Sequence, residues 1–257
     1  MSGLSYVQTL ALVCPLVFLA GFVDSIAGGG GLISLPAYLA AGLPVHIAAG
    51  TNKFSMMLGT SMSVVRYSKS GNIKLKTALT AIAGAIPGAW IGTRLALFLE
   101  DKYLKGTLLV IIPLAALFIL FSGKLKKNIP DQKPISRMKK ILLSMGIGLV
   151  LGCYDGLIGP GTGTFLILAF ASLLQYSLLV SSGSAKIVNL ASNCISALLF
   201  IISGNVWYAL AFPAALCTVA GNALGSRLAI RNGERLIRPV MLVVLALLFL
   251  KIGIDLF

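Results

Sequence analysis

The stretch GFVDSIAGGGGLISLP, residues 21–36, decides the fold class of this protein. It places Asp24 and four consecutive glycines inside a run that is otherwise apolar enough for a transmembrane helix. Glycine permits unusual backbone angles, and non-helical backbone persists at membrane depth only where protein buries it or where it lines a water-filled cavity. The stretch therefore predicts a broken or re-entrant helix beside a cavity in a membrane protein.

Composition extends this prediction to the whole chain. Of its 257 residues, 58% are hydrophobic and only 11% are charged, whereas a soluble globular domain carries roughly 25% charged residues. We therefore expect an all-α polytopic protein that passes several times through the cell (inner or cytoplasmic) membrane. No Lys or Arg precedes the first apolar run and no cleavage pattern follows it, so we expect that this run is retained. Segments of the length that crosses a bilayer, about 20 residues, lie near residues 6–27, 46–66, 77–98, 105–122, 139–158, 164–180, 184–203, 207–229 and 237–256, and the piece 31–42 is too short to span comfortably.

The net charge of +14 indicates membrane topology rather than binding of nucleic acid. The positive residues lie in short loops between the expected spans, where the positive-inside rule accounts for them. No cluster of histidines or carboxylates, no metal-ligand spacing and no nucleophile with a candidate base is present in the sequence, so we expect neither an enzyme nor a metal or cofactor site. The four cysteines lie far apart in apolar segments and predict neither a zinc site nor a disulfide framework; they are Cys14, Cys153, Cys194 and Cys217.

An internal repeat divides the chain into two halves. A shift of 133 residues aligns SGNI at 70–73 with SGNV at 203–206 and GTRLA at 92–96 with GSRLA at 225–229. Two separate motifs that align at the same offset are unlikely to arise by chance, and such repeats are common in secondary transporters. The predicted organisation is a first transmembrane repeat at 1–123, a basic cytoplasmic linker at 124–138 and a second transmembrane repeat at 139–257.

Loop charges predict that the two repeats have inverted topology. The loop after the third apolar piece is basic in the first half, whereas its counterpart at 203–207 carries no charge. Under the positive-inside rule the linker and the basic loops are cytoplasmic, so each half crosses the membrane an odd number of times. Each half has five crossings if the short piece spans, or three if the first two segments form a re-entrant hairpin. The basic loops contain Arg66, Lys69, Lys74 and Lys76, and Arg227, Arg231, Arg235 and Arg238.

Four ionisable residues lie deep in the apolar segments, in two repeat-related pairs. The shift of 133 residues carries Lys53 onto Lys186, and a shift of 131 residues carries Asp24 onto Asp155. A charge at the bilayer centre costs roughly 2.5–3.5 kcal/mol even on insertion scales, so such residues serve function or pair with one another. Either the lysines bind a small anion, or they are structural ions paired with the aspartates.

The glycine runs also recur, as GGGG at 28–31 and GPGTG at 159–163. If the helices break there, exposed amide groups and the N-termini of the following helices would form a concavity that binds anions. The alternative is that the glycines only allow tight packing of helices. Together with the lysines and nearby hydroxyls, the first alternative suits transport of a small anion.

The same residues carry a family resemblance over nearly the whole chain. GFVDSIAGGGGLISLPAYLAAGLPVHIAAGTNK, followed by SGNI and GAIPGAWIGTRLA, resembles the sulfite exporter TauE/SafE family of bacterial and archaeal membrane transporters. The resemblance implies export of sulfite or a small organosulfonate, with other sulfur oxyanions or carboxylates moved by some relatives. The second half departs from the pattern, because it has GPGTG in place of a richer glycine run and SGSAKIVN where the first half has AGTNKFSM.

The resemblance also implies a substrate site at the centre of the membrane. We expect Asp24 and Asp155 to be available for coupling, and Asn193, one helical turn beyond Asn189 on the same face, is a weaker candidate for the site. Partners would be a small anionic sulfur-containing substrate, the lipid bilayer and a second copy of the chain in a homodimer. The alternatives are uptake of thiosulfate or another small anion, in which Cys153 would take part, and a passive anion channel. The expected substrate-binding residues are Ser25, Gly28, Gly29, Gly30, Gly31, Thr51, Asn52, Lys53, Gly159, Gly161, Thr162, Gly163, Ser184, Lys186 and Asn189.

Overall fold

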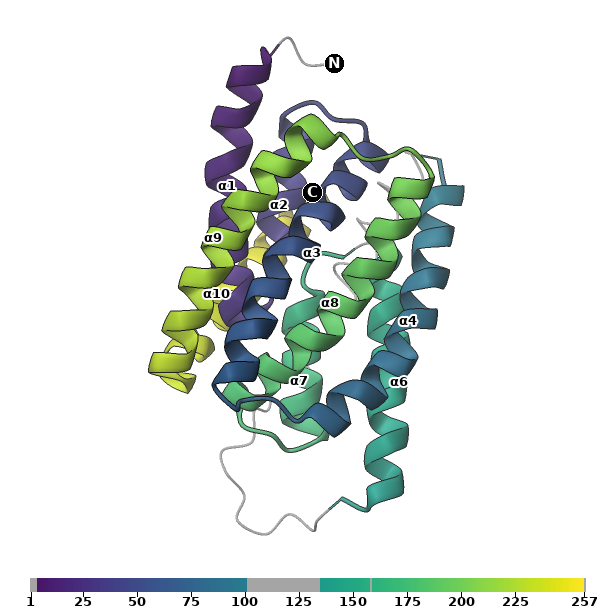
Figure 1. Cartoon of the computed structure of the whole chain (residues 1–257), viewed down its shortest axis with the longest axis vertical. Coiled ribbons are helices and arrows are strands. Elements are labelled where there is room, and N and C mark those ends of the chain that lie inside the picture. The colour runs from purple at the N-terminus through teal and green to yellow at the C-terminus, as the bar shows by residue number, and fades with distance from the viewer. Residues whose placement is uncertain (1–3, 101–134, 158, 257) are drawn as a thin grey trace.

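The protein is a bundle of α-helices in a computed structural model that describes residues 4–100, 135–157 and 159–256 (Figure 1). The described residues contain no β-strand, which confirms the predicted all-α class. The expected span 105–122 and most of the expected linker 124–138 lie outside the described residues. The helices are α1 (Tyr6–Ala27), α2 (Gly31–Ala40), α3 (Val45–Lys69), α4 (Leu75–Phe98), α6 (Arg137–Leu157), α7 (Thr162–Leu173), α8 (Leu178–Ile202), α9 (Tyr208–Asn232) and α10 (Glu234–Leu256).

Five of the described helices are long and apolar enough to cross a membrane, namely α1, α4, α6, α8 and α9. The expected span 164–180 is wrong. Helix α7 has only 12 residues, about 18 Å of helix, which covers little more than half of a hydrocarbon core. The chain turns at Gln175, whose φ is 61°. Ser177 then caps the start of α8, because its side chain accepts a hydrogen bond from the Val180 N–H. Hydropathy alone does not detect this turn, because apolar residues continue on both sides of it.

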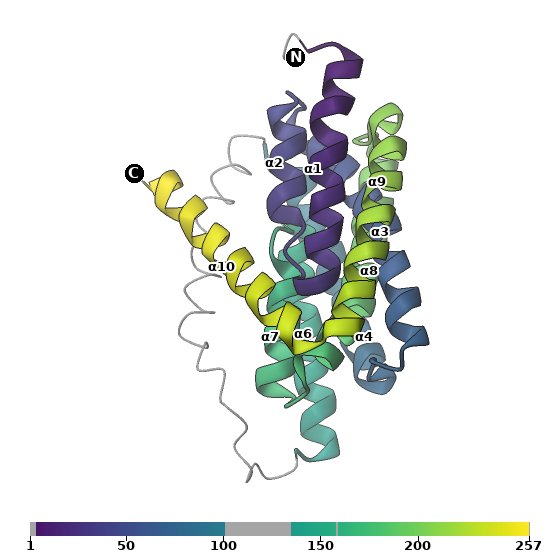
Figure 2. The same ribbon diagram turned by 90° about the vertical axis from the view of Figure 1, so that its left-hand side faces the viewer.

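Each half begins with a hairpin of one long and one short helix. Helix α2 runs back alongside α1 (Figure 2), and α7 follows α6 in the same way along the chain. Left-handed glycines end both long helices, with φ of 83° at Gly28 and 87° at Gly159. The two breaks meet, because a Cβ on Gly28 would collide with the backbone of Gly163. The predicted helix breaks at the glycine motifs are thus present, and they lie together at the centre of the bundle.

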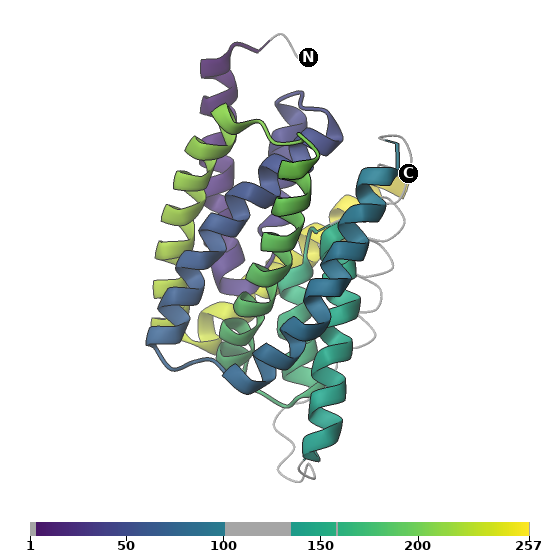
Figure 3. The same ribbon diagram turned by 45° about the vertical axis from the view of Figure 1, so that its right-hand side comes forward.

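The two halves interlock, since the closest helix pairs join one half to the other. Helix α1 packs against α9, and α4 packs against α6 (Figure 3). Glycine makes both contacts possible. In α9, a Cβ at Gly221 would collide with the Phe18 carbonyl of α1, and one at Gly225 with the Phe22 carbonyl. In α4, a Cβ at Gly88 would collide with the Leu149 carbonyl of α6. Small residues let helix backbones approach in this way. Tight packing is therefore the role of these interface glycines.

The directions of equivalent helices are compatible with inverted repeats. In Figure 1, α1 descends from the N-terminus, whereas α6 rises from the opposite end of the bundle. Likewise α3 descends and α8 ascends. Helices α3 and α8 contact each other and carry the buried lysines of the two halves. The centre of the bundle thus holds α3, α8 and the two helix breaks.

Candidate functional site

The buried charges pair crosswise between the halves. The Nζ atom of Lys53 lies 2.9 Å from Oδ2 of Asp155, and the Nζ atom of Lys186 lies 2.8 Å from Oδ2 of Asp24. No more than 6% of any of these four side chains is exposed. The structure therefore shows the paired arrangement that the sequence left open, and each lysine takes its partner from the other half.

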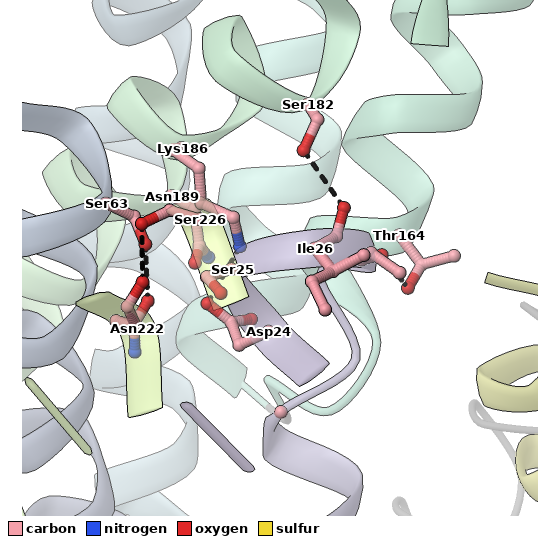
Figure 4. A network of polar contacts seen from close by, with 12 residues as sticks. Asp24, Ser25, Ile26, Ser63, Thr164, Ser182, Lys186, Asn189, Asn222 and Ser226 are labelled. Atoms are coloured by element: carbon pink, nitrogen blue, oxygen red, sulfur yellow. Dashed lines mark hydrogen bonds and ion pairs between the residues drawn. The ribbon is translucent and has the colours of Figure 1, made fainter. Parts of the chain in front are cut away.

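Helix position explains why these pairs form. Asp24 and Asp155 lie in the last turns of α1 and α6, immediately before the breaks. Lys53 and Lys186 lie on α3 and α8, which pass the breaks at the centre of the bundle. Burying a single charge would cost several kcal/mol, and a close partner offsets much of that cost. Figure 4 shows the Lys186 side chain extending from α8 toward Asp24.

A small polar cavity lies where the breaks and α3 and α8 meet. Its volume of ≈ 20 Å³ is room for about one water molecule. A sulfur oxyanion is larger than water, so the cavity must widen before it can hold such a ligand. Its walls are formed by Asp24, Gly28, Gly31, Asn52, Lys53, Met56, Asp155, Gly159, Gly163, Asn189 and Asn193.

The cavity brings together about half of the residues expected at the site. Both aspartates expected for coupling also line it, and so does the weaker candidate Asn193. Met56 was missed, although it follows Asn52 by one helical turn on the same face. The expected residues in the walls are Gly28, Gly31, Asn52, Lys53, Gly159, Gly163 and Asn189.

The N-terminal ends of both short helices reach this cavity. Gly31 is the first residue of α2, and Gly163 is the second residue of α7. The unpaired N–H groups and the macrodipole make a helix N-terminus a favourable place for an anion. Together with the Lys53 ammonium group and the amides of Asn52 and Asn189, these helix ends form a cavity rich in hydrogen-bond donors.

Thr51 and Ser184 lie elsewhere, in a pair of matching contacts. Oγ1 of Thr51 accepts a hydrogen bond of 3.1 Å from the backbone N–H of Trp207. Oγ of Ser184 accepts one of 3.0 Å from the backbone N–H of Lys74. The two bonds are related by the repeat, and each joins the central helix of one half to the loop that starts a helix of the other half. These hydroxyls hold loops in place and do not line the cavity.

The remaining expected residues also lie outside the cavity walls. The hydroxyl of Ser25 donates to the Phe22 carbonyl, and that of Thr162 donates to the Gly159 carbonyl. Gly29 faces Val244 of α10, and Gly30 lies against Asp24 and Met56. The other two are Gly161, which precedes α7 with a φ of 85°, and Lys186, which pairs with Asp24 but does not itself line the cavity.

Cys153 does not line the cavity either. Its backbone carbonyl faces Gly92 in the interface of α4 with α6, and it is absent from the cavity walls. The structure therefore gives no support to a part for this cysteine in thiosulfate transport.

Comparison with known proteins places this chain among membrane transporters. Residues 13–252 match the family described as "Sulfite exporter TauE/SafE". Similar proteins include the "Probable membrane transporter protein ORF9" of Sinorhizobium sp., 32% identical over 96% of this chain and 93% of that protein. The "Probable membrane transporter protein YfcA" of Escherichia coli K12 is 32% identical over 96% of this chain and 94% of that protein. A "Probable membrane transporter protein" of Haemophilus influenzae is 31% identical over 97% of this chain and 96% of that protein. No solved structure matches the chain significantly.

Proposed function

Because the chain belongs to the TauE/SafE family of membrane transporters, we propose that it exports sulfite or a small organosulfonate across the cytoplasmic membrane. The substrate site is the central cavity. Access alternates between the two sides as the interlocked halves rock around it, a mode of transport that internal repeats favour. The basic loops and the linker face the cytoplasm.

The observation that carries this proposal is the convergence of anion-binding groups on one buried cavity. Lys53 supplies a compact positive charge, and the N-termini of α2 and α7 direct their positive ends to the same place. Amides from Asn52 and Asn189 add hydrogen-bond donors for an oxyanion. The small volume of the cavity favours a transporter that opens to one side at a time over a passive anion channel.

Export needs no coupling under ordinary conditions. A membrane potential of 100 mV, negative inside, is worth about 2.3 kcal/mol per charge moved, and it drives an anion outward. If transport runs against a gradient, the two buried aspartates are the candidates to carry a proton, and Asp155, which keeps a hydrogen bond from Ser192 when it leaves its lysine, is better placed than Asp24. Flux in vesicles that ignores a proton gradient, and that stays unchanged in Asp155→Asn and Asp24→Asn proteins, would exclude such coupling.

The direct test is flux in proteoliposomes. Vesicles containing the purified protein and ³⁵S-labelled sulfite should lose label in a saturable way when a valinomycin potential is applied. The Lys53→Ala protein should lose this flux, whereas Lys69→Ala, an exposed lysine at the end of the same helix, is the matched control and should retain it. Efflux no faster than from empty liposomes would refute the proposal, and single-channel currents would favour the passive channel. Uptake against the imposed potential would favour an importer.

A further inference from the structure

We propose that the two buried ion pairs have different roles in the transporter proposed above. Lys186 with Asp24 is a permanent cross-link between the halves. Lys53 is the one cation that meets the substrate, and Asp155 occupies it only while the site is empty. With a single cation available, the site takes a monovalent oxyanion, such as a sulfonate or hydrogen sulfite, in preference to a divalent one.

Residues beside the pairs break the symmetry of the repeat. The polar residues of α8 near the Lys53 pair have smaller or less polar counterparts on α3. The pairs of equivalent residues are Asn189 with Met56, Ser192 with Gly59 and Asn193 with Thr60. The surroundings of the two lysines therefore differ, although the lysines themselves are related by the repeat.

Polar groups that can replace each ionic partner surround Lys53 and Asp155. Lys53 Nζ donates to Oδ1 of Asn193 at 3.1 Å in addition to its aspartate. The Ser192 hydroxyl donates to Asp155 at 2.6 Å. When an incoming anion displaces Asp155 from Lys53, Asp155 retains its hydrogen bond from Ser192, and Lys53 retains its hydrogen bond to Asn193. Exchange of partners is therefore possible without leaving either charge bare.

The other pair lacks such alternatives. Among the described residues, Lys186 Nζ donates only to Asp24, its side chain is 0% exposed, and it does not line the cavity. Thr60, the repeat counterpart of Asn193, does not hydrogen-bond to Lys186, because its buried hydroxyl oxygen has no hydrogen-bond partner in the described part of the chain. Separating this pair would strand two buried charges, which is strongly unfavourable.

The end of α1 that carries Asp24 is also held in place by hydrogen bonds from side chains to its backbone carbonyls. Carbonyl groups in the last turn of a helix lack intrahelical partners. In α1, Ser182 donates to the Ile26 carbonyl (Figure 4). Thr164 donates to the Ala27 carbonyl, and Tyr67 donates to the Ser25 carbonyl. The repeat places Ala49 opposite Ser182 and Phe200 opposite Tyr67, and neither has a hydroxyl group. The end of α6 that carries Asp155 therefore lacks these two anchors and is freer to move.

The cavity wall also contains a polar atom that lacks a hydrogen-bond partner, on the residue next to Lys53. Asn52, the residue before Lys53, is 7% exposed and lines the cavity, and its Oδ1 atom has no hydrogen-bond partner in the described part of the chain. Its counterpart near Lys186 is Ala185. The Nδ2 group of this carboxamide can donate to an oxyanion, and the unpaired Oδ1 can accept from a ligand hydroxyl, such as that of hydrogen sulfite.

Charge balance sets the preferred substrate. The two lysines and two aspartates sum to no net charge, so the site offers an anion one exchangeable cation, Lys53, together with the helix N-termini. A second negative charge would lose its hydration without gaining a second cation. Methanesulfonate and sulfate, which are both tetrahedral and differ in charge, distinguish this arrangement from a site in which both lysines bind the anion.

The experiment measures calorimetric affinities of the purified protein for these two anions. Methanesulfonate should bind at least about tenfold more tightly than sulfate. Two charge-swapped proteins are compared, Lys53→Asp/Asp155→Lys and Lys186→Asp/Asp24→Lys, after each is shown to be monodisperse. The first swap puts a carboxylate in place of the Lys53 ammonium group and moves the cation to position 155 at the end of α6, so it should weaken methanesulfonate binding at least about tenfold more than the second.

Each outcome has a distinct meaning. Equal losses in both swaps, or preference of the wild type for sulfate, would overturn the division of roles while leaving an anion transporter. A wild type that binds neither these anions nor sulfite would overturn the proposed function itself, and this inference with it. If a swap does not fold, the neutral pairs Lys53→Met/Asp155→Asn and Lys186→Met/Asp24→Asn take its place with the same expected ranking.

Discussion

Lys53 on α3 and Asp155 on α6 lie 2.9 Å apart although they belong to different halves of the chain. Lys186 and Asp24 repeat this relationship in the opposite sense at 2.8 Å. Since α1 packs on α9 and α4 on α6, both the ionic contacts and the helix packing run between halves. Neither half can therefore bury its own charge, and the central site exists only when both halves assemble.

The crosswise pairing predicts how stability responds to neutral substitutions. Lys186→Met leaves Asp24 buried without its partner and should destabilise the protein by about 3–5 kcal/mol. Lys186→Met/Asp24→Asn removes both charges and should regain most of this loss. Thermal unfolding in detergent compares the two proteins with the wild type. A double variant no more stable than the single one would show that the pair does not act as a unit.

The contact between the helix breaks predicts a strong effect at Gly28. In Gly28→Ala the new methyl group would collide with the backbone of Gly163, and the residue would also hold a φ of 83°. Gly71→Ala is the matched control, because Gly71 has a φ of 73° with nothing within 4 Å of the added Cβ. We expect the control to lose about 1 kcal/mol of its free energy of unfolding from strain alone. Gly28→Ala should lose considerably more stability and give much less folded protein. Equal yields and melting temperatures would contradict the close approach of the breaks.

Much of the fold could be predicted because the sequence repeats its unusual features. Glycine runs, acids and lysines recur at nearly constant offsets, and they predicted helix breaks at a central site in both halves. The class of helical membrane protein followed from composition. The span at 164–180 could not be corrected from hydropathy, since the turn at Gln175 is a backbone event within an apolar region.

The site could be predicted only in part, because sequence offsets do not reveal which residues meet. Two buried acids and two lysines allow pairing within or between halves, and only the packing of the helices decides. Thr51 and Ser184 were expected at the substrate site, and each lies two positions before a lysine. On a helix, positions two apart point to different sides, so these hydroxyls face the loops while the lysines face the aspartates.

The matching loop contacts of Thr51 and Ser184 predict a structural effect for their removal. Thr51→Val keeps the shape of the side chain but leaves the Trp207 N–H without its acceptor, at a cost of about 1–3 kcal/mol if the group stays buried. Thr51→Ser keeps the acceptor and should unfold near the wild-type temperature. Ser184→Ala should resemble Thr51→Val, since it removes the acceptor of the Lys74 N–H. Both losses should appear in melting temperature, with the ranking of bound anions unchanged.

Inverted topology predicts that equivalent turns lie on opposite sides of the membrane. Ser70 and Ser203 follow α3 and α8 at matching positions of the repeat, and both are exposed. The turn at Ser70 belongs to the basic loop, so we expect it in the cytoplasm, and the turn at Ser203 should face outward. In a background without the four native cysteines, Ser203→Cys in intact cells should react with a membrane-impermeant maleimide. Ser70→Cys should react only after the cells are opened. Labelling of both positions from the same side would mean that α3 and α8 cross in the same direction, and the rocking mechanism around an inverted pair of halves would then have to be abandoned.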